Sequence, residues 1–182
     1  TVDYALRQHF GSAFCTLHAS AGDARLPASS ILAFLKTHPG IEVLSSHHSA
    51  PWIPSTHKYI VFDIVSVRHP LLRLASMYRH HCAKAAVVPL SRAASAREFL
   101  EAMLDRHPHL VSNSQVTTLA HGGHFTRPAA EPDLFAAQEV LIRCAVVCVV
   151  ERMDESLTLA EYFLQPAFGS LNLACPRQNV TD

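Results

Sequence analysis

The stretch VSVRHPLLRLASMYRHH, residues 65–81, carries the side chains best suited to bind an anion. Arg68 ends a run of β-forming residues, and Pro70 suits the first position of a following helix. On that helix, Arg73 and Ser76 are about one turn apart. Open α/β sheets bind ligands at the carboxyl ends of their strands, where Arg68 would lie. A guanidinium and a hydroxyl converging there can hold a phosphate through charge-assisted hydrogen bonds.

The residues alone leave a simpler interpretation open. An arginine at an arbitrary strand-to-helix turn is more often solvated or paired with a carboxylate, and that holds for Arg68 and Arg73 alike. The order of the surrounding elements, a buried strand followed directly by a helix, favours the phosphate site over this simpler interpretation.

The surrounding pattern predicts strands alternating with helices. KYIVFDIVSVR (58–68) is an apolar run typical of an interior strand, and IEVLSS (41–46) and AVVCVVE (145–151) are further strands. We expect an α/β fold of three layers, with a mainly parallel central sheet flanked by helices. The length fits a single domain over residues 1–182. Helices are predicted around residues 1–10, 31–38, 70–78, 95–107, 113–121, 133–145 and 153–165, the last ended by Pro166.

The string formed by Arg68, Pro70, Arg73, Ser76 and Tyr78 resembles the 3'-phosphate-binding segment of PAPS-dependent sulfotransferases. The resemblance is to the carbohydrate-modifying, heparan sulfate 2-O-sulfotransferase-like branch. It implies a P-loop-like sulfotransferase fold, with Arg68 and Ser76 as cofactor ligands and Arg73 as a further candidate.

Two later segments are similar to the same family and follow in the same order. NSQVTTLAHG (113–122) resembles an Asn-x-Gln-x-x-x-Leu segment, and VVCVVERMDESLTL (146–159) resembles a late strand followed by a Glu-Arg-x-Asp-Glu-Ser helix start. The resemblance implies direct in-line transfer of a sulfuryl group from PAPS to a hydroxyl, with PAP as product and no metal. The implied acceptor is a carbohydrate or another hydroxyl-bearing small molecule.

The family's other nucleotide element is a loop of the type Pro-Lys-x-Gly-Gly-Thr, which this sequence lacks. TVDYALRQHF resembles the helix that follows the loop, so the fold is expected to be incomplete at its amino end, with Thr1 as the last loop residue or its neighbour. Backbone amides and a lysine at such a helix start bind phosphate, so we expect poor PAPS binding without them. Arg177 lies where the family often has a basic tail segment and is a candidate nucleotide contact, although it also fits a solvated loop arginine.

The candidate catalytic base is a histidine after the predicted strand at residues 41–46. Enzymes of the 2-O-sulfotransferase kind have a Gly-His pair in a similar place, which His47 matches best, with Ser46 replacing the glycine. His48 is the substitute if the register differs by one. A histidine with a pKa near neutrality can take the proton of an attacking hydroxyl. A histidine that only hydrogen-bonds the backbone explains the same residues.

The amino-acid composition limits the kinds of partner and compartment that the sequence predicts. Fifteen basic and fifteen acidic residues balance, so no overall field favours nucleic acid, and no run of about 18 apolar residues predicts a membrane span. Membrane attachment would need a segment upstream of Thr1. The five cysteines fit either a reduced protein or one or two disulfides. The compartment stays open between the cytoplasm, for a bacterial protein, and the Golgi lumen, for a eukaryotic one.

Three rival functions follow from the same residues. Thirteen histidines suggest a metal site, but no His-Glu-x-x-His or paired Cys-x-x-Cys spacing is present. A P-loop kinase or other nucleotide-binding transferase lacks its Gly-x-x-x-x-Gly-Lys signature here. A non-catalytic, sulfotransferase-like binding or structural domain also fits, because a fold does not determine its function.

Overall fold

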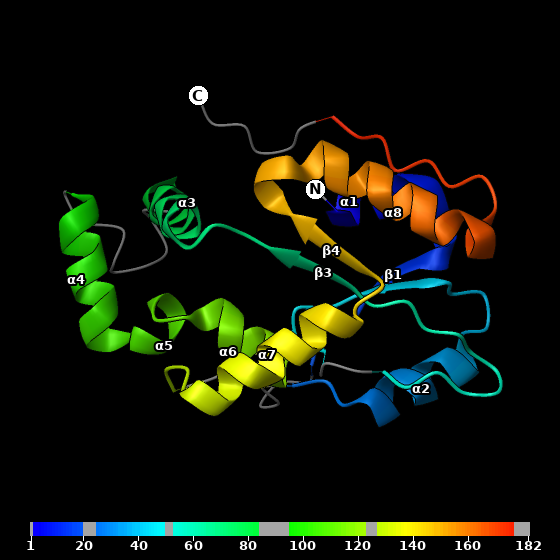
Figure 1. Ribbon diagram of the computed structural model, residues 1–182, viewed down its shortest axis with the longest axis horizontal. Helices are drawn as coiled ribbons and strands as arrows, with labels where there is room; N and C mark the ends of the chain where they lie inside the picture. Colours follow the sequence, from blue (N-terminus) through cyan, green and yellow to red (C-terminus); the bar gives the residue numbers. More distant parts are fainter. Residues whose placement is uncertain (1, 20–24, 50–52, 84–94, 123–126, 177–182) are drawn as a thin grey trace.

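The computed structural model describes residues 2–19, 25–49, 53–83, 95–122 and 127–176. Thr1 and Arg177, two of the candidate nucleotide ligands, lie outside these residues. Within the described part the fold is α/β, with short parallel strands between helices (Figure 1).

The first half of the chain builds one two-stranded sheet. Helix α1 (Val2–Phe10) leads through a 3-10 turn into β1 (Phe14–Thr16), and α2 (Ala28–Thr37) connects β1 to β2 (Val43–Ser45). β1 and β2 are parallel, with Phe14 opposite Val43. Parallel strands need a crossover connection of this kind, and α2 supplies it.

The second half builds the other parallel sheet. β3 (Ile64–Val67) pairs with β4 (Val146–Val149) along its whole length, with Ile64 opposite Val146. Among the described residues, five helices lie between these two strands in the sequence. The first four are α3 (Pro70–Ala83), α4 (Ala96–Arg106), the short α5 (Pro108–Val111) and α6 (Ser114–His121). A fifth, α7 (Glu131–Arg143), packs on α6 and leads directly into β4.

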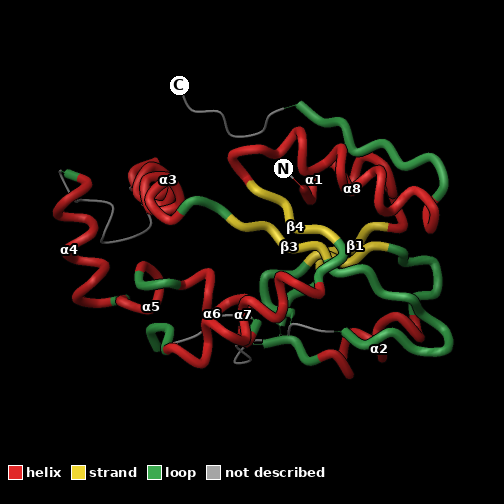
Figure 2. The backbone as a smooth tube through the Cα atoms, viewed as in Figure 1, coloured by secondary structure: helices red, strands yellow, loops and turns green. Residues whose placement is uncertain are grey.

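One core joins the two sheets. The last helix, α8 (Met153–Phe168), lies with α1 on one face of the strands, while α2 and α7 lie on the other (Figure 1). The tube view shows the four strands side by side between these helices, and α3, α4 and α5 to one side of them (Figure 2). The buried cluster draws on both sheets and both helices: Ala5, Leu6, Phe14, Val146, Cys148, Leu157, Ala160, Leu164, Leu171 and Leu173.

Most of the predicted helices are present where the sequence placed them. Pro70 is the first residue of α3, and Ser95 caps α4 by accepting a hydrogen bond from the Glu98 N–H. α1 ends before Gly11, whose φ of 53° only glycine adopts without strain. The α/β class and the parallel direction of the strands are confirmed, but the described strands form two separate two-stranded sheets and not the single central sheet expected.

Two expectations about element boundaries were wrong, and two elements were not predicted. The predicted strand at residues 58–68 is regular only over Ile64–Val67, because β4 offers it four partners, and Ile60 is exposed. Helix α8 continues past Pro166 to Phe168 and ends at Gly169. The strand β1 was not predicted. The helix predicted before Pro108 ends at Arg106, as expected, and Pro108 begins the short α5, which was not predicted.

The continuation of α8 past Pro166 has a packing explanation. The ring of Phe168 lies edge-on to Phe10 and to Phe62, at centroid distances of 5.5 Å and 5.9 Å. These aromatic contacts offset the backbone hydrogen bond that Pro166 cannot donate. The five cysteines, all among the described residues, form no disulfide.

Candidate functional site

Three segments that are distant in the sequence meet at Arg68, at the carboxyl end of β3. The side-chain amide of Gln115 bonds the main chain of Arg68 twice. It accepts from the Arg68 N–H at 2.8 Å and donates to the Arg68 carbonyl at 2.7 Å. The start of α6 therefore fixes the backbone from which the Arg68 side chain projects.

Glu151, in the turn after β4, holds the same point from the other side. Its carboxylate accepts from the Arg68 Nε at 3.4 Å and from the backbone N–H of His69 at 3.2 Å. The Arg68 and Glu151 side chains are 29% and 27% exposed, so solvent weakens this ion pair. Since the hydrogen bond to Glu151 uses Nε, the Nη groups of the guanidinium have N–H donors left to bind an anion.

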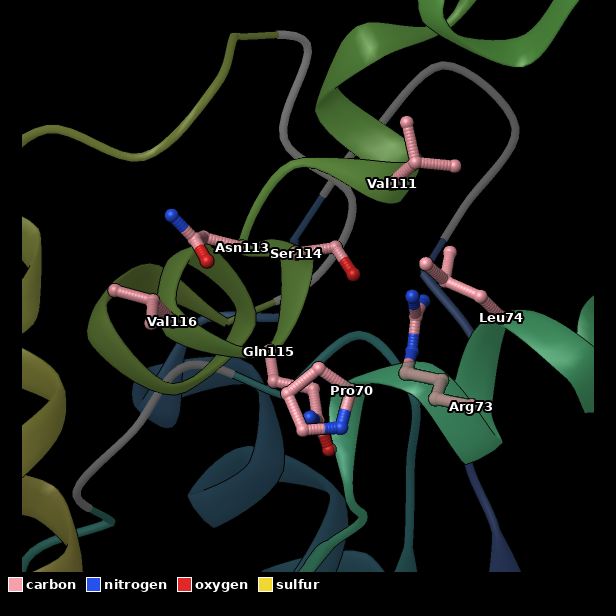
Figure 3. A pocket seen from close by; sticks show the side chains of 8 residues that line it. All are labelled: Pro70, Arg73, Leu74, Val111, Asn113, Ser114, Gln115 and Val116. Atoms are coloured by element: carbon pink, nitrogen blue, oxygen red, sulfur yellow. The ribbon is translucent and has the colours of Figure 1, made fainter. Parts of the chain in front are cut away.

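Arg73 and Ser76 lie on α3, which begins two residues after Arg68, and both are half-buried. The Arg73 guanidinium turns toward α5 and donates from Nη1 to the Leu110 carbonyl at 3.0 Å. It lines a pocket with residues of α3, α5 and α6 (Figure 3). Burial lowers the pKa of Arg73 from its ordinary value, although arginine stays charged at neutral pH. Of the two arginines predicted to bind the anion, Arg68 therefore lies at the strand end and Arg73 lies in the adjoining pocket.

The candidate bases lie at the end of the other sheet. His47 is exposed and His48 half-buried, just after β2. The His48 main chain is held by two neighbours: its N–H donates to the Ser46 Oγ at 3.0 Å, and its carbonyl accepts from Leu26 at 2.6 Å. The His18 ring lies edge-on to the His48 ring at 6.2 Å. The candidate bases and Arg68 each follow the carboxyl end of a strand, but those strands, β2 and β3, belong to different strand pairs.

A second arginine–carboxylate cluster lies between α6 and α7. Asp133 is only 3% exposed and accepts hydrogen bonds from Arg127 at 2.6 and 2.9 Å, from the Ala130 N–H at 2.7 Å, and pairs with His121 at 2.6 Å. These contacts, that of Arg127 above all, hold the pKa of Asp133 well below its usual range. Both carboxylate oxygens are occupied, so this cluster is structural.

Two groups near the starts of β3 and β4 also have shifted pKa values. Burial raises the pKa of the Asp63 carboxyl, just before β3. Burial, with the nearby charge of Asp63, raises the pKa of the Cys144 thiol to about 11. Cys144 is therefore a protonated thiol at neutral pH and a poor nucleophile.

The sequence did not predict the contacts of Gln115 and Glu151 with Arg68, although both residues belong to segments that resemble the sulfotransferase family. The Asn-x-Gln pattern and the Glu-Arg-x-Asp-Glu-Ser pattern were quoted for a family resemblance, with no contact assigned to either. The available signal was only a glutamine near the start of a predicted helix, at the second residue of α6. Its partner lies 47 residues away, and periodicity cannot identify it.

Neither a protein-family model, nor a curated protein, nor a solved structure matches this chain. Among the described residues, no group of three or more His, Cys, Asp or Glu side chains is arranged to hold a metal ion. No helix in that part of the chain is long and apolar enough to cross a membrane. The chemistry of the site is accordingly argued from its own geometry.

Proposed function

We propose that this chain is part of a PAPS-dependent sulfotransferase that transfers a sulfuryl group to a hydroxyl, with a carbohydrate as the favoured acceptor. The observation that carries the proposal is the meeting of Arg68, Gln115 and Glu151 at one strand end. These residues come from the three segments that resemble the family, and nothing in their sequence spacing requires them to touch.

In this proposal the Arg68 side chain binds the 3'-phosphate of the nucleotide. Gln115 fixes the Arg68 backbone and Glu151 bonds its Nε, so the rotamer freedom lost on binding is small. The Nη groups then donate to the phosphate oxygens as a planar fork. Ser76, on the first turns of α3, adds a hydroxyl donor. The finer assignment, a P-loop-like fold with a phosphosulfate loop before Thr1, belongs to the same proposal.

The histidine after β2 is the proposed base. In the transfer, the acceptor oxygen forms a bond to sulfur while the bond between sulfur and the bridging oxygen of PAPS breaks. The proton of the acceptor hydroxyl passes to the imidazole of His47, or of His48 in the alternative register. His47 is exposed, so an acceptor can reach it. Nucleotide supplies the sulfuryl group, and the chain supplies the phosphate donors and the base.

Calorimetry with PAP tests the nucleotide part of the proposal. The titration uses this chain, a form extended upstream of Thr1 through a strand and phosphate-binding loop, and Arg68→Ala in each. Arg97→Ala is the matched control, because Arg97 is 87% exposed on α4 and pairs with Glu101 of the same helix.

We expect PAP binding to strengthen in the extended form. Arg68→Ala should weaken it by about 10- to 100-fold, the cost of losing charge-assisted hydrogen bonds. Arg97→Ala should leave it unchanged. Absence of PAP binding by the extended form would contradict the proposal and favour a binding or structural domain. Binding that survives Arg68→Ala would retain a nucleotide protein but reject the assigned phosphate ligand.

A further inference from the structure

A pocket of about 100 Å³ lies between α3, α5 and α6, next to the Arg68 site (Figure 3). Most of its wall is carbon. Its polar lining comes from Arg73, Asn113, Ser114 and Gln115, of which the Arg73 guanidinium and the Ser114 hydroxyl carry the argument. Figure 3 shows these two groups pointing toward one another across the pocket, from α3 and from the first residue of α6. The apolar lining comes from Pro70, Leu74, Val111 and Val116.

The Ser114 hydroxyl is the first sign of a ligand. Ser114 is 8% exposed, and within the described residues its Oγ has no hydrogen-bond partner. A buried hydroxyl without a partner costs roughly 1–3 kcal/mol in protein measurements, and such groups are rare in native structures. An oxygen acceptor placed in the pocket would remove this cost.

Arg73 is the second sign, and it is independent of the first. Its guanidinium is half-buried, and within the described part of the chain it has no carboxylate partner; its hydrogen bond there goes to the Leu110 carbonyl. A guanidinium carries five N–H donors, so donors are left for a ligand. A half-buried cation without a countercharge favours an anion in the adjoining space.

The start of α6 also favours an anion in the pocket, although less strongly than Arg73 does. The first N–H groups of a helix have no carbonyl partner within it, and they carry a partial positive charge. Asn113, which precedes α6 with a φ of 54°, does not cap it with its side chain. The helix start, Ser114 and Arg73 therefore favour negative charge at one place.

We propose that this pocket binds the carboxylate of a small aliphatic acid, at a site distinct from the proposed nucleotide site. The carboxylate would accept hydrogen bonds from Arg73 and Ser114, and its short carbon chain would contact Leu74, Val111 and Val116. The apolar wall argues for a monoanion with a carbon body over sulfate or phosphate, which are more strongly hydrated and lose more on entering such a space. The inference does not depend on the sulfotransferase proposal.

Butyrate is the probe, with 1-butanol and inorganic sulfate as matched comparisons. Each is titrated into the full chain while amide NMR signals of Ser114 and Gln115 are followed. The variants are Ser114→Ala, Arg73→Met and the exposed control Arg97→Met. We expect butyrate to bind with a Kd of about 1–10 mM, in keeping with six heavy atoms. Butanol, which lacks the charge, should bind at least about 10-fold more weakly.

Ser114→Ala should weaken butyrate binding about 5- to 10-fold, and Arg73→Met should abolish it, while Arg97→Met has no effect. Without ligand, Ser114→Ala should melt at the same temperature as the parent chain or higher, because it removes an unsatisfied hydroxyl. This variant keeps the test decisive even if Arg73→Met fails to fold. The proposal would be overturned if Ser114→Ala left the butyrate affinity unchanged. It would also be overturned if no binding were seen at a butyrate concentration 50-fold above the expected Kd, about 50–500 mM.

Two further titrations, with PAP and with sulfate, test whether the pocket is distinct from the nucleotide site and whether it prefers a carboxylate. Saturating PAP should leave the butyrate affinity unchanged if the sites are distinct, and displacement of butyrate by PAP would overturn that distinction. Sulfate that binds as well as butyrate would overturn the ligand class. If PAP fails to bind the form extended upstream of Thr1 while butyrate binds as described, the nucleotide proposal falls and the carboxylate pocket stands.

Discussion

Two of the arginine–carboxylate contacts among the described residues, one around Asp133 and one around Arg68, differ in their surroundings. In the buried one, Asp133 is almost fully enclosed, and Arg127, His121 and the Ala130 N–H occupy both of its oxygens. In the open one, Arg68 and Glu151 are each more than a quarter exposed and share one longer contact of 3.4 Å.

The difference separates a structural role from a binding role. A saturated buried carboxylate leaves nothing for a ligand, and removing one partner exposes an uncompensated charge to a dry environment. A partly exposed arginine held through its backbone and its Nε keeps its Nη donors available. Variants of the buried cluster should therefore affect folding, and variants around Arg68 should affect anion binding.

The largest effect is expected from Asp133→Ala. The variant leaves Arg127 and His121 without their shared acceptor and uncaps α7, so its melting temperature should fall by roughly 10 °C. Thermal unfolding followed by circular dichroism measures this. Glu139→Ala is the control, because Glu139 is exposed and pairs only along α7 with Arg143. A fall in PAP affinity at temperatures where Asp133→Ala is still folded would contradict the division of roles.

Gln115→Ala should show the opposite profile. It removes both hydrogen bonds to the Arg68 main chain, so PAP binding in the extended form should weaken about 10-fold as Arg68 loses its fixed position. Calorimetry measures the affinity. Gln138→Ala, an exposed glutamine on α7, is the matched control. An unchanged PAP affinity in Gln115→Ala would mean that the amide does not position the arginine.

The pH dependence of stability follows from Asp133. Because its pKa is lower in the folded chain than the value near 4 of an unfolded aspartate, ionised Asp133 stabilises the fold above about pH 4. That contribution is lost as the pH falls through the folded pKa. The difference in denaturant midpoint between the parent chain and Asp133→Asn should therefore be largest near pH 6 and narrow below about pH 4. A difference that widens in acid would reverse the sign and refute the explanation.

The smallest effect is expected from Glu151→Gln. The glutamine carbonyl can still accept from Arg68 and His69, so the geometry stays while a negative charge leaves the anion site. PAP should bind about two- to threefold more tightly at low ionic strength, and salt should remove the gain. Calorimetry at two salt concentrations tests this, and weaker binding at both would show that the carboxylate itself is needed.

Local signals in the sequence predicted the helices well. Pro70 starts α3 and Ser95 caps α4 because both effects depend on nearest neighbours. The strands were predicted less accurately, because a strand extends only as far as its partner does. Ile60 and its neighbours have strong β propensity and still lie outside β3, since β4 pairs with four residues. Pro166 failed as a stop because Phe168 packs against distant aromatic rings.

The candidate site was predictable in its identity and not in its contacts. Arg68 was placed at a strand end from its own neighbours, and it lies there. That Arg73 would turn toward Leu110 required the position of α5, a helix that the sequence did not reveal. The unsatisfied Ser114 hydroxyl could not be predicted either, because hydrogen-bond satisfaction depends on every neighbour in space.

The double hydrogen bond between Gln115 and the main chain of Arg68 has a consequence for solubility. The amide occupies one N–H and one C=O as a neighbouring peptide group would, so it imitates one residue of an additional strand. Exposed strand edges recruit other chains through such groups. At Arg68, the residue that follows β3, a single side chain thus closes the edge against strand addition while the arginine side chain stays partly exposed to solvent.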